Sequence, residues 1–214
     1  PQIRKDFGPI KTSIGLGVWI DAQGKQPFLI APEIEATVSL LRDLFIPYVR
    51  IDGGVLQNRY QRALRSNPFV NLPMASVMDS IKTWHNTYET IHATAGMRGS
   101  ITRSFTFNIN AEFKRNNQHL FWVPQHGDGD GRSFIPLYQD INITSLHGDA
   151  AWKLGKSTEL LGHVAQHNYR IRDSLTNVQE AWFMPRLELE AAIQHTIKGK
   201  LRVKANVLIQ TGRK

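Results

Sequence analysis

The segment ITRSFTFNINAEF, residues 101–113, decides the class of fold that this chain adopts. From Phe105 to Phe113 every second residue is apolar, and the intervening residues from Ser104 to Glu112 are polar. Because successive side chains of a strand point to opposite faces, this pattern predicts a β-strand with one apolar and one polar face. A helix would instead repeat its apolar positions every three or four residues.

The same alternation recurs along most of the chain, and each recurrence is bounded by turn-forming residues. It predicts about nine strands. Their expected ranges are 11–21, 27–41, 44–56, 87–101, 103–116, 136–152, 157–171, 179–197 and 201–212.

The connections between these strands alternate in length. Tight turns are expected at 42–43, 102–103, 153–156 and 198–200, and longer connections at 21–26, 56–88, 116–137 and 172–177. Short turns at one end and long loops at the other are typical of β-barrels that cross an outer membrane. The predicted fold is therefore an all-β, antiparallel, up-and-down transmembrane β-barrel, in which 56–88 forms a long external loop.

The predicted strand number bears on the size of the barrel. Closed single-chain barrels of the bacterial type have an even number of strands, and about nine strands do not fit that rule. We therefore expect residues 1–214 to form a single β-barrel segment of a larger barrel, with no plug domain in this chain. Residues 211–214 also lack the final aromatic residue that many outer-membrane barrels carry, which favours the same interpretation.

Composition excludes several other classes of protein. Hydrophobic residues make up 41% of the 214, and no apolar run approaches the roughly 20 residues of a membrane-spanning helix. Cysteine is absent, which excludes disulfides and thiolate metal sites. Lys and Arg number 26 against 18 Asp and Glu, but these charges are dispersed and form no nucleic-acid motif. We therefore expect no nucleic-acid partner.

Ionisable side chains at mid-strand indicate which face would avoid lipid. A Lys or Arg that faces lipid at the bilayer midplane costs about 2–4 kcal/mol, so these groups are expected to point into a polar lumen. Aromatic residues near strand ends, such as Phe45, Phe105 and Trp152, fit the interfacial girdles of a barrel. The candidate lumen-lining residues are Arg50, Asp52, Arg98, Glu112, Lys114, Arg186, Glu188, Glu190, Arg202 and Lys204.

Two local features depart from simple alternation. Between Ile141 and Trp152 the apolar positions change parity, which indicates a β-bulge. Helical periodicity is confined to parts of 56–66 and 75–84, both inside the longest loop.

No motif predicts catalysis. The chain has neither a Gly-x-Ser-x-Gly elbow nor an HExxH pair, so we expect no enzyme activity and no cofactor. Asp128 and Asp130 lie in a Gly-rich loop and are weak candidates for Ca²⁺ ligands. The spaced ligands of an EF-hand loop are missing there, so a solvated turn is the favoured interpretation and no metal is predicted.

Two pairs of residues share strand faces without predicting a site. His163 and His167 would lie about 13 Å apart, too far to chelate one ion. Glu188 and Glu190 would lie about 7 Å apart, a spacing that also suits glycosidase carboxylates. A cross-strand charge ladder is the favoured explanation for the glutamates, and its other members would be Arg186, Arg202 and Lys204.

Several stretches resemble a known family. They are LFIPYVRIDGGV (44–55), NRY (58–60), SNPFV (66–70) and GMRGSI (96–101), the last followed by the alternating segment 104–113. These are similar to large outer-membrane β-barrels of Bacteroidota, including TonB-dependent-receptor-like proteins. The resemblance implies the outer membrane of a Gram-negative bacterium, contact with outer-membrane lipid, and solute passage or uptake. It also implies partnership with TonB-type energy-coupling or other envelope proteins. The family's plug domain and coupling motif are not in this chain, so the resemblance concerns the barrel portion only.

Three functions remain open at this point. The first is passage or uptake of a solute through a TonB-dependent-receptor-like or porin-like barrel. The second is a non-conducting structural or secretion-associated barrel subunit. The third is a soluble, basic β-sandwich that acts as a binding module, although sandwich strands are usually about five or six residues long and these exceed ten.

Overall fold

The computed structural model describes residues 2–22, 26–41, 44–66, 85–124, 134–172, 181 and 184–212. Strands dominate these ranges, with one short helix. In chain order the elements are β1 (Gln2–Phe7), β2 (Ile10–Ile20), β3 (Phe28–Val38), β4 (Phe45–Leu56), α1 (Tyr60–Ser66), β5 (Thr87–Thr102), β6 (Phe105–Pro124), β7 (Phe134–Leu154), β8 (Thr158–Ile171), β9 (Leu187–Ile197) and β10 (Leu201–Thr211).

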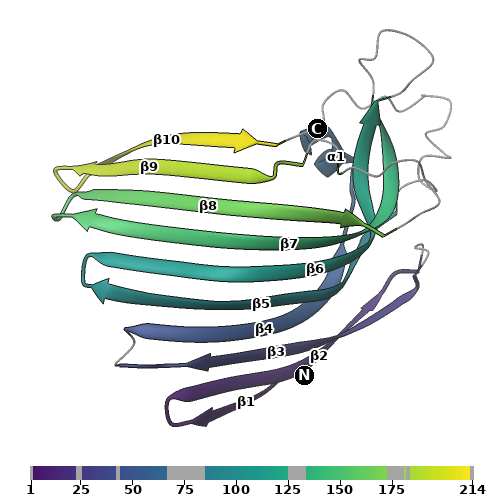
Figure 1. Ribbon diagram of the computed structural model, residues 1–214, viewed down its shortest axis with the longest axis horizontal. Coiled ribbons are helices and arrows are strands. Elements are labelled where there is room, and N and C mark those ends of the chain that lie inside the picture. The colour runs from purple at the N-terminus through teal and green to yellow at the C-terminus, as the bar shows by residue number, and fades with distance from the viewer. Residues whose placement is uncertain are drawn as a thin grey trace.

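The strands form one 10-stranded sheet in chain order, each antiparallel to the next. The sheet is curved, with tight turns at one end and the longer connections at the other (Figure 1). This arrangement confirms the predicted all-β, up-and-down barrel class. The described residues make a single sheet rather than the two packed sheets of a sandwich.

The structure has one strand more than the sequence predicted. The additional strand, β1, carries Arg4, Lys5 and Asp6 in succession, which hides its alternation. It pairs with β2 across a turn at Gly8, whose φ of 61° lies in the left-handed region that glycine adopts without strain. Ten is an even number, but within the described residues β1 pairs only with β2 and β10 only with β9, so these two strands are the edges of an open sheet.

Most strand bounds agree with the prediction to within a few residues, but β6 and β9 differ by more. β6 continues to Pro124 and β7 begins at Phe134, so this hairpin extends beyond the predicted ends at 116 and 136 (Figure 1). β9 begins only at Leu187, later than the predicted residue 179.

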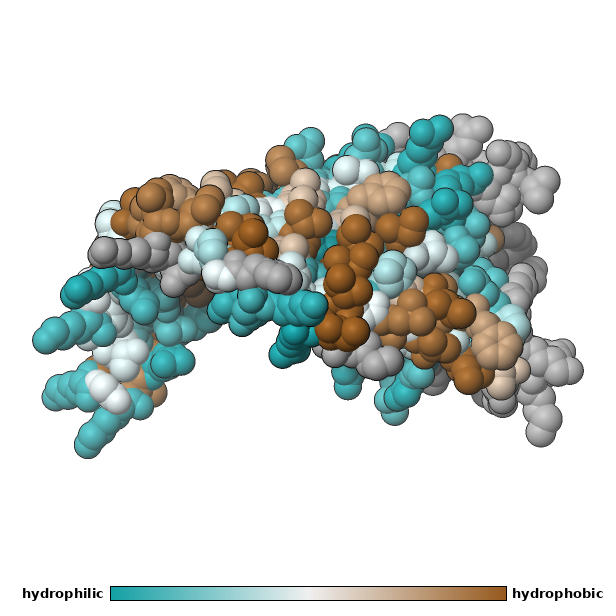
Figure 2. All heavy atoms as spheres, turned by 90° about the horizontal axis from the view of Figure 1, so that it is seen from below, coloured by the Kyte–Doolittle hydropathy of each residue, from teal (hydrophilic) through white to brown (hydrophobic). Residues whose placement is uncertain are grey.

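The pairing register sorts the side chains onto two faces. Pairs such as Ile14–Ile34 and Leu189–Ile209 lie on what we call the apolar face. Its large aliphatic side chains are exposed, with Ile14 at 58% and Ile209 at 51%. Charged and amide side chains occupy the opposite, polar face. In a space-filling view, hydrophobic and hydrophilic residues gather on different parts of the arched surface (Figure 2).

A small buried cluster lies on the polar face near the long connections. It consists of Phe121, Ile141 and Ile143, and the side chains packed against it include Tyr169 and Met184. Tyr169 also donates a hydrogen bond from its hydroxyl to the carbonyl of Pro185, at 2.8 Å. The segment that leads into β9 therefore packs against the polar face at this end of the sheet.

The predicted bulge between Ile141 and Trp152 is wrong. Over that range β7 pairs with β8 without a register shift, and the shift lies in the facing strand β6, between Asn116 and His119. The apolar positions change parity for another reason. Ile141 and Ile143 are buried on the polar face, whereas Trp152 lies on the apolar face, opposite Phe105.

The helix α1 lies within the predicted helical range 56–66, and the other range, 75–84, is outside the described residues. In the part of the chain that the structure describes, no helix has the length and apolar character needed to cross a membrane.

Two glycines of the apolar face provide a matched test of the packing. A Cβ added at Gly99 would lie 2.0 Å from the carbonyl oxygen of Leu44, whereas one added at Gly162 would meet nothing within 4 Å. We expect Gly99→Ala to lower the free energy of unfolding by about 1–3 kcal/mol, because the backbone must shift. Gly162→Ala should leave it unchanged or raise it by up to about 1 kcal/mol. Urea unfolding in detergent, followed by tryptophan fluorescence, measures both, and equal stabilities would contradict the register of β4 and β5.

Candidate functional site

The polar face of β1 to β5 encloses a groove of about 890 Å³. Each of the five strands contributes ionisable side chains to its lining, for example Arg4, Lys11, Glu35, Asp52 and His92. Because one concavity extends across consecutive strands, the polar face is the hollow side of the sheet.

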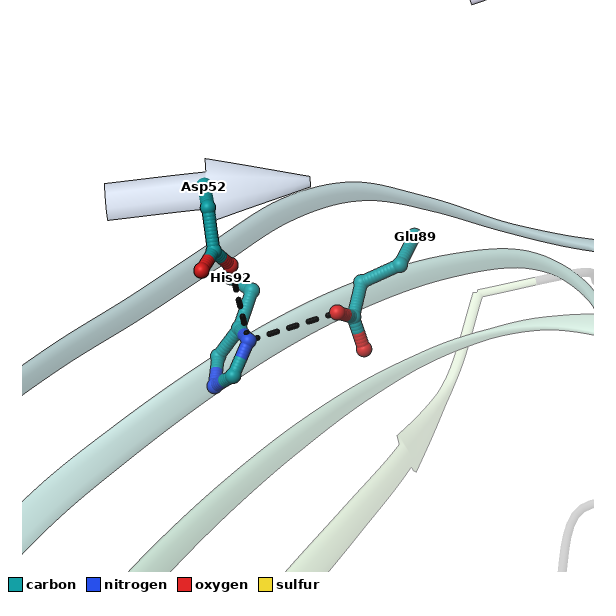
Figure 3. A group of neighbouring side chains, drawn as sticks. All are labelled: Asp52, Glu89 and His92. Atoms are coloured by element: carbon teal, nitrogen blue, oxygen red, sulfur yellow. Dashed lines mark ion pairs between the residues drawn. The ribbon is translucent and has the colours of Figure 1, made fainter. Parts of the chain in front are cut away.

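His92, on β5, is the centre of the densest group of ionisable side chains in the groove. Its Nδ1 lies 2.9 Å from Asp52 Oδ1 and 3.3 Å from Glu89 Oε1 (Figure 3). Its Nε2 lies 2.6 Å from Glu112 Oε1 on β6. One imidazole therefore contacts three carboxylates, supplied by three neighbouring strands.

A β-bulge brings Glu89 into this group. Residues three apart in a regular strand point to opposite faces, so Glu89 and His92 would normally be separated by the sheet. The register shifts between Glu89 and Ile91 on β5 and between Asp52 and Gly54 on β4, which turns Glu89 to the polar face. A Cβ at Gly53 would lie 2.7 Å from the carbonyl oxygen of Glu89, so the close approach of the two strands requires glycine there.

Two cations balance part of this negative charge. Arg50 Nη2 lies 2.6 Å from Asp52 Oδ2, and Lys114 Nζ lies 2.9 Å from Glu112 Oε1. The Arg50 side chain is 59% exposed, whereas the side chains of Asp52 and Glu112 are only 14% and 15% exposed. The carboxylates are thus shielded from water, and Arg50 reaches them from the open side of the groove.

A second group of histidines lies farther along the polar face. His163 Nδ1 lies 2.6 Å from Asp149 Oδ1, and His167 Nδ1 lies 2.7 Å from the hydroxyl of Ser145. His147 lies between them, with ring centroids 6.1 Å from His163 and 5.5 Å from His167. His147, on the adjacent strand, therefore lies between His163 and His167.

The structure places nine of the ten predicted lumen-lining residues on the polar face. The cross-strand pairs that establish this are Arg50–Thr94, Asp52–His92, Arg98–Asn108, Glu112–Ser145, Lys114–His92, Glu188–Gln210, Glu190–His163, Arg202–Thr196 and Lys204–Gln194. The tenth, Arg186, precedes β9, and its side chain packs beside Gly212. The weak metal candidates Asp128 and Asp130 are outside the described residues.

The predicted charge ladder on β9 and β10 is wrong. Glu188 is opposite Gln210 and Glu190 is opposite Leu208, while Arg202 and Lys204 pair with Thr196 and Gln194 nearer the turn. The sequence showed the right face but not the register between the two strands.

Sequence reasoning missed Glu89 and His147 as members of these groups. Alternation puts Glu89 on the apolar face of a regular strand, and the sequence feature that could have corrected this is the Gly53-Gly54 pair on the partner strand. His147 was missed because the side chains that it contacts belong to other strands, and the alternation within one strand does not reveal how that strand is aligned with its neighbours.

The ion pairs of the groove should differ in their contributions to stability. Glu112 contacts His92, Lys114 and His147 and is largely shielded, so we expect Glu112→Gln to cost about 1.5–3 kcal/mol. Arg50→Gln removes a side chain that pairs with Asp52 from solvent, so its expected cost is under about 1 kcal/mol. Urea unfolding in nonionic detergent compares the losses of stability in the two variants. A loss in Arg50→Gln that equals or exceeds the loss in Glu112→Gln would contradict the geometry of the cluster.

Comparison with known proteins identifies the fold. No family model and no curated protein matches the chain. The structure of the copper transporter OprC is similar, with a TM-score of 0.59 at 11% identity over 92% of this chain and 32% of that one. The FrpB iron transporter from Neisseria meningitidis (F3-3 variant) gives 0.55 at 10% identity, over 95% of this chain and 31% of its own.

This chain therefore spans about a third of the length of these two transporters. At such identities the likeness concerns the fold alone, and that fold is an antiparallel, up-and-down transmembrane β-barrel.

Proposed function

We propose that this chain is part of an outer-membrane β-barrel through which a solute passes or is taken up. The observation that carries the proposal is the contrast between the two faces of the sheet. Ion pairs and histidines line the hollow face, while large aliphatic side chains are exposed on the other. A barrel with a polar interior and an apolar exterior can carry hydrated solutes across lipid.

The structural comparisons support transport as the general role. The two structures compared above are transporters by name, one for copper and one for iron. The resemblance of residues 44–70 and 91–122 to TonB-dependent-receptor-like barrels of Bacteroidota adds energised uptake to porin-like passage as a form of this role. In this proposal the chain lies in the outer membrane of a Gram-negative bacterium, contacts its lipid, and works with a TonB-type envelope protein.

The polar face would form the wall of the lumen. Arg98 holds a central place on it, because it lines both the groove of β1 to β5 and a second groove of about 650 Å³ that continues toward β10. Its guanidinium lies 5.7 Å from the centre of the Tyr48 ring. A solute that moves along the lumen would therefore pass Arg98 in this proposal.

The apolar face gives a test of the membrane location. Ile193 and Gln194 are adjacent on β9, and Ile193 lies on the apolar face, 46% exposed. Ile193→Arg should lower stability in a bilayer by about 2–4 kcal/mol, because the charge would face lipid. Gln194→Arg points to the polar face opposite Lys204 and next to Glu159, and it should change stability little. Unfolding from lipid vesicles measures both, and equal effects would argue against a lipid-facing side.

Solute passage can be tested by conductance. In a planar bilayer the full-length protein should conduct KCl, and Arg98→Glu should shift its selectivity toward cations, because charged side chains that line a pore set ion preference. Arg103→Glu is the matched control, since Arg103 is exposed in the turn between β5 and β6. A protein that reaches the outer membrane yet neither conducts in either form nor supports uptake of a solute would favour a structural or secretion-associated role.

A further inference from the structure

We propose that Asp52, Glu89 and His92 form a binding site for a divalent first-row transition cation. The site would supply one imidazole nitrogen and two carboxylate oxygens, a ligand set that suits Zn²⁺ and its neighbours. The chain has no cysteine, which leaves nitrogen and oxygen as its principal metal donors. This inference goes beyond solute passage, because a cation can bind here whether or not the barrel conducts.

The positions of the donor atoms are close to those of a metal site. One atom from each of the three side chains lies within 4.8 Å of the other two. Bonds of about 2.0–2.2 Å in a tetrahedral site separate the ligand atoms by roughly 3.3–3.6 Å. The separations from His92 Nδ1 are 2.9 Å to Asp52 and 3.3 Å to Glu89, so only small side-chain rotations are needed.

Glu112 gives the imidazole the orientation that metal binding requires. It lies 2.6 Å from His92 Nε2, and in the tautomer that carries its hydrogen on Nε2 this carboxylate accepts that hydrogen and the Nδ1 lone pair is directed at Asp52 and Glu89. Histidine ligands of metals commonly donate their second ring N–H to a carboxylate in this way. Nδ1 then faces two further carboxylates, an arrangement that only a bound proton or a metal cation can satisfy.

The surrounding charges also favour a cation. The carboxylates of Asp52, Glu89 and Glu112 outnumber the cations Arg50 and Lys114, which leaves one net negative charge around a neutral imidazole. Arg50 binds Asp52 through Oδ2, so Oδ1 is available to a metal. All three proposed ligands line the groove, which gives a cation a route of entry and leaves room for a water ligand.

Zinc titration of the full-length protein, purified in detergent without a histidine tag, tests the site. Calorimetry should show one Zn²⁺ bound, and Co²⁺ in its place should give the visible absorption of a low-coordinate nitrogen and oxygen site. His92→Gln should abolish binding, and Glu89→Gln should weaken it by about tenfold or more. Glu112→Gln removes only the orienting carboxylate and should cost about 10–100-fold in affinity.

Two control variants isolate the site. Glu35→Gln removes the same charge from the same groove without touching His92, and it should bind Zn²⁺ as the unmodified protein does. His163→Gln removes a member of the second histidine group and should also leave binding intact. Urea unfolding checks that each variant folds. If His92→Gln does not fold, Glu89→Gln takes its place as the variant that tests the site.

The outcomes are distinct from those of the conductance experiment. Failure of the unmodified protein to bind Zn²⁺ or Co²⁺ overturns the proposal, and so does binding that survives both His92→Gln and Glu89→Gln. Loss of binding in His163→Gln alone would assign the metal to the histidine group instead, and would also overturn it. None of these results depends on whether a solute passes.

Discussion

Hydrogen bonding between neighbouring strands is the constraint on which the rest of this structure depends. Each backbone N–H and C=O that enters a membrane needs a partner, and in a sheet that partner is the next strand. The resulting ladder forces side chains to alternate between two faces. Over strands as long as β6 (Phe105–Pro124) and β7 (Phe134–Leu154), each strand must therefore supply two unlike surfaces at once. The exposed aliphatic residues and the charged groove are two consequences of the same ladder.

This explains why the faces were predictable and the contacts were not. The face of a residue depends on its position within its own strand, so Asp52, Glu112 and Lys114 were assigned to the polar face from local alternation. A contact depends on the register between two strands, which turns and bulges determine. The grouping of His147 with His163 and His167 could not be predicted without that register. For the same reason the charge ladder expected between Glu190 and Arg202 was wrong.

The His92 cluster shows what a local break in the ladder achieves. A perfectly regular β5 would present His92 to the groove and Glu89 to the other side. The bulge in β5 moves Glu89 to the groove, and the absence of a side chain at Gly53 lets β4 and β5 approach closely enough. The densest set of ionisable contacts in the groove thus arises where the regular pattern fails. Bulges next to functional sites commonly change the face to which a side chain points, and sequence periodicity does not predict them.

The polar face changes character along its length. In mid-sheet it consists of ion pairs around His92 and Glu112, which are best satisfied beside water. Toward the long connections it carries a buried cluster in which Ile141 is fully buried and Met184 packs, beside the buried amides of Asn116 and Gln139. Met184, which precedes β9, therefore covers part of the face there. If the proposed transport role holds, discrimination by charge would fall to the ionic groove of mid-sheet, because the ion pairs around His92 line that part of the face.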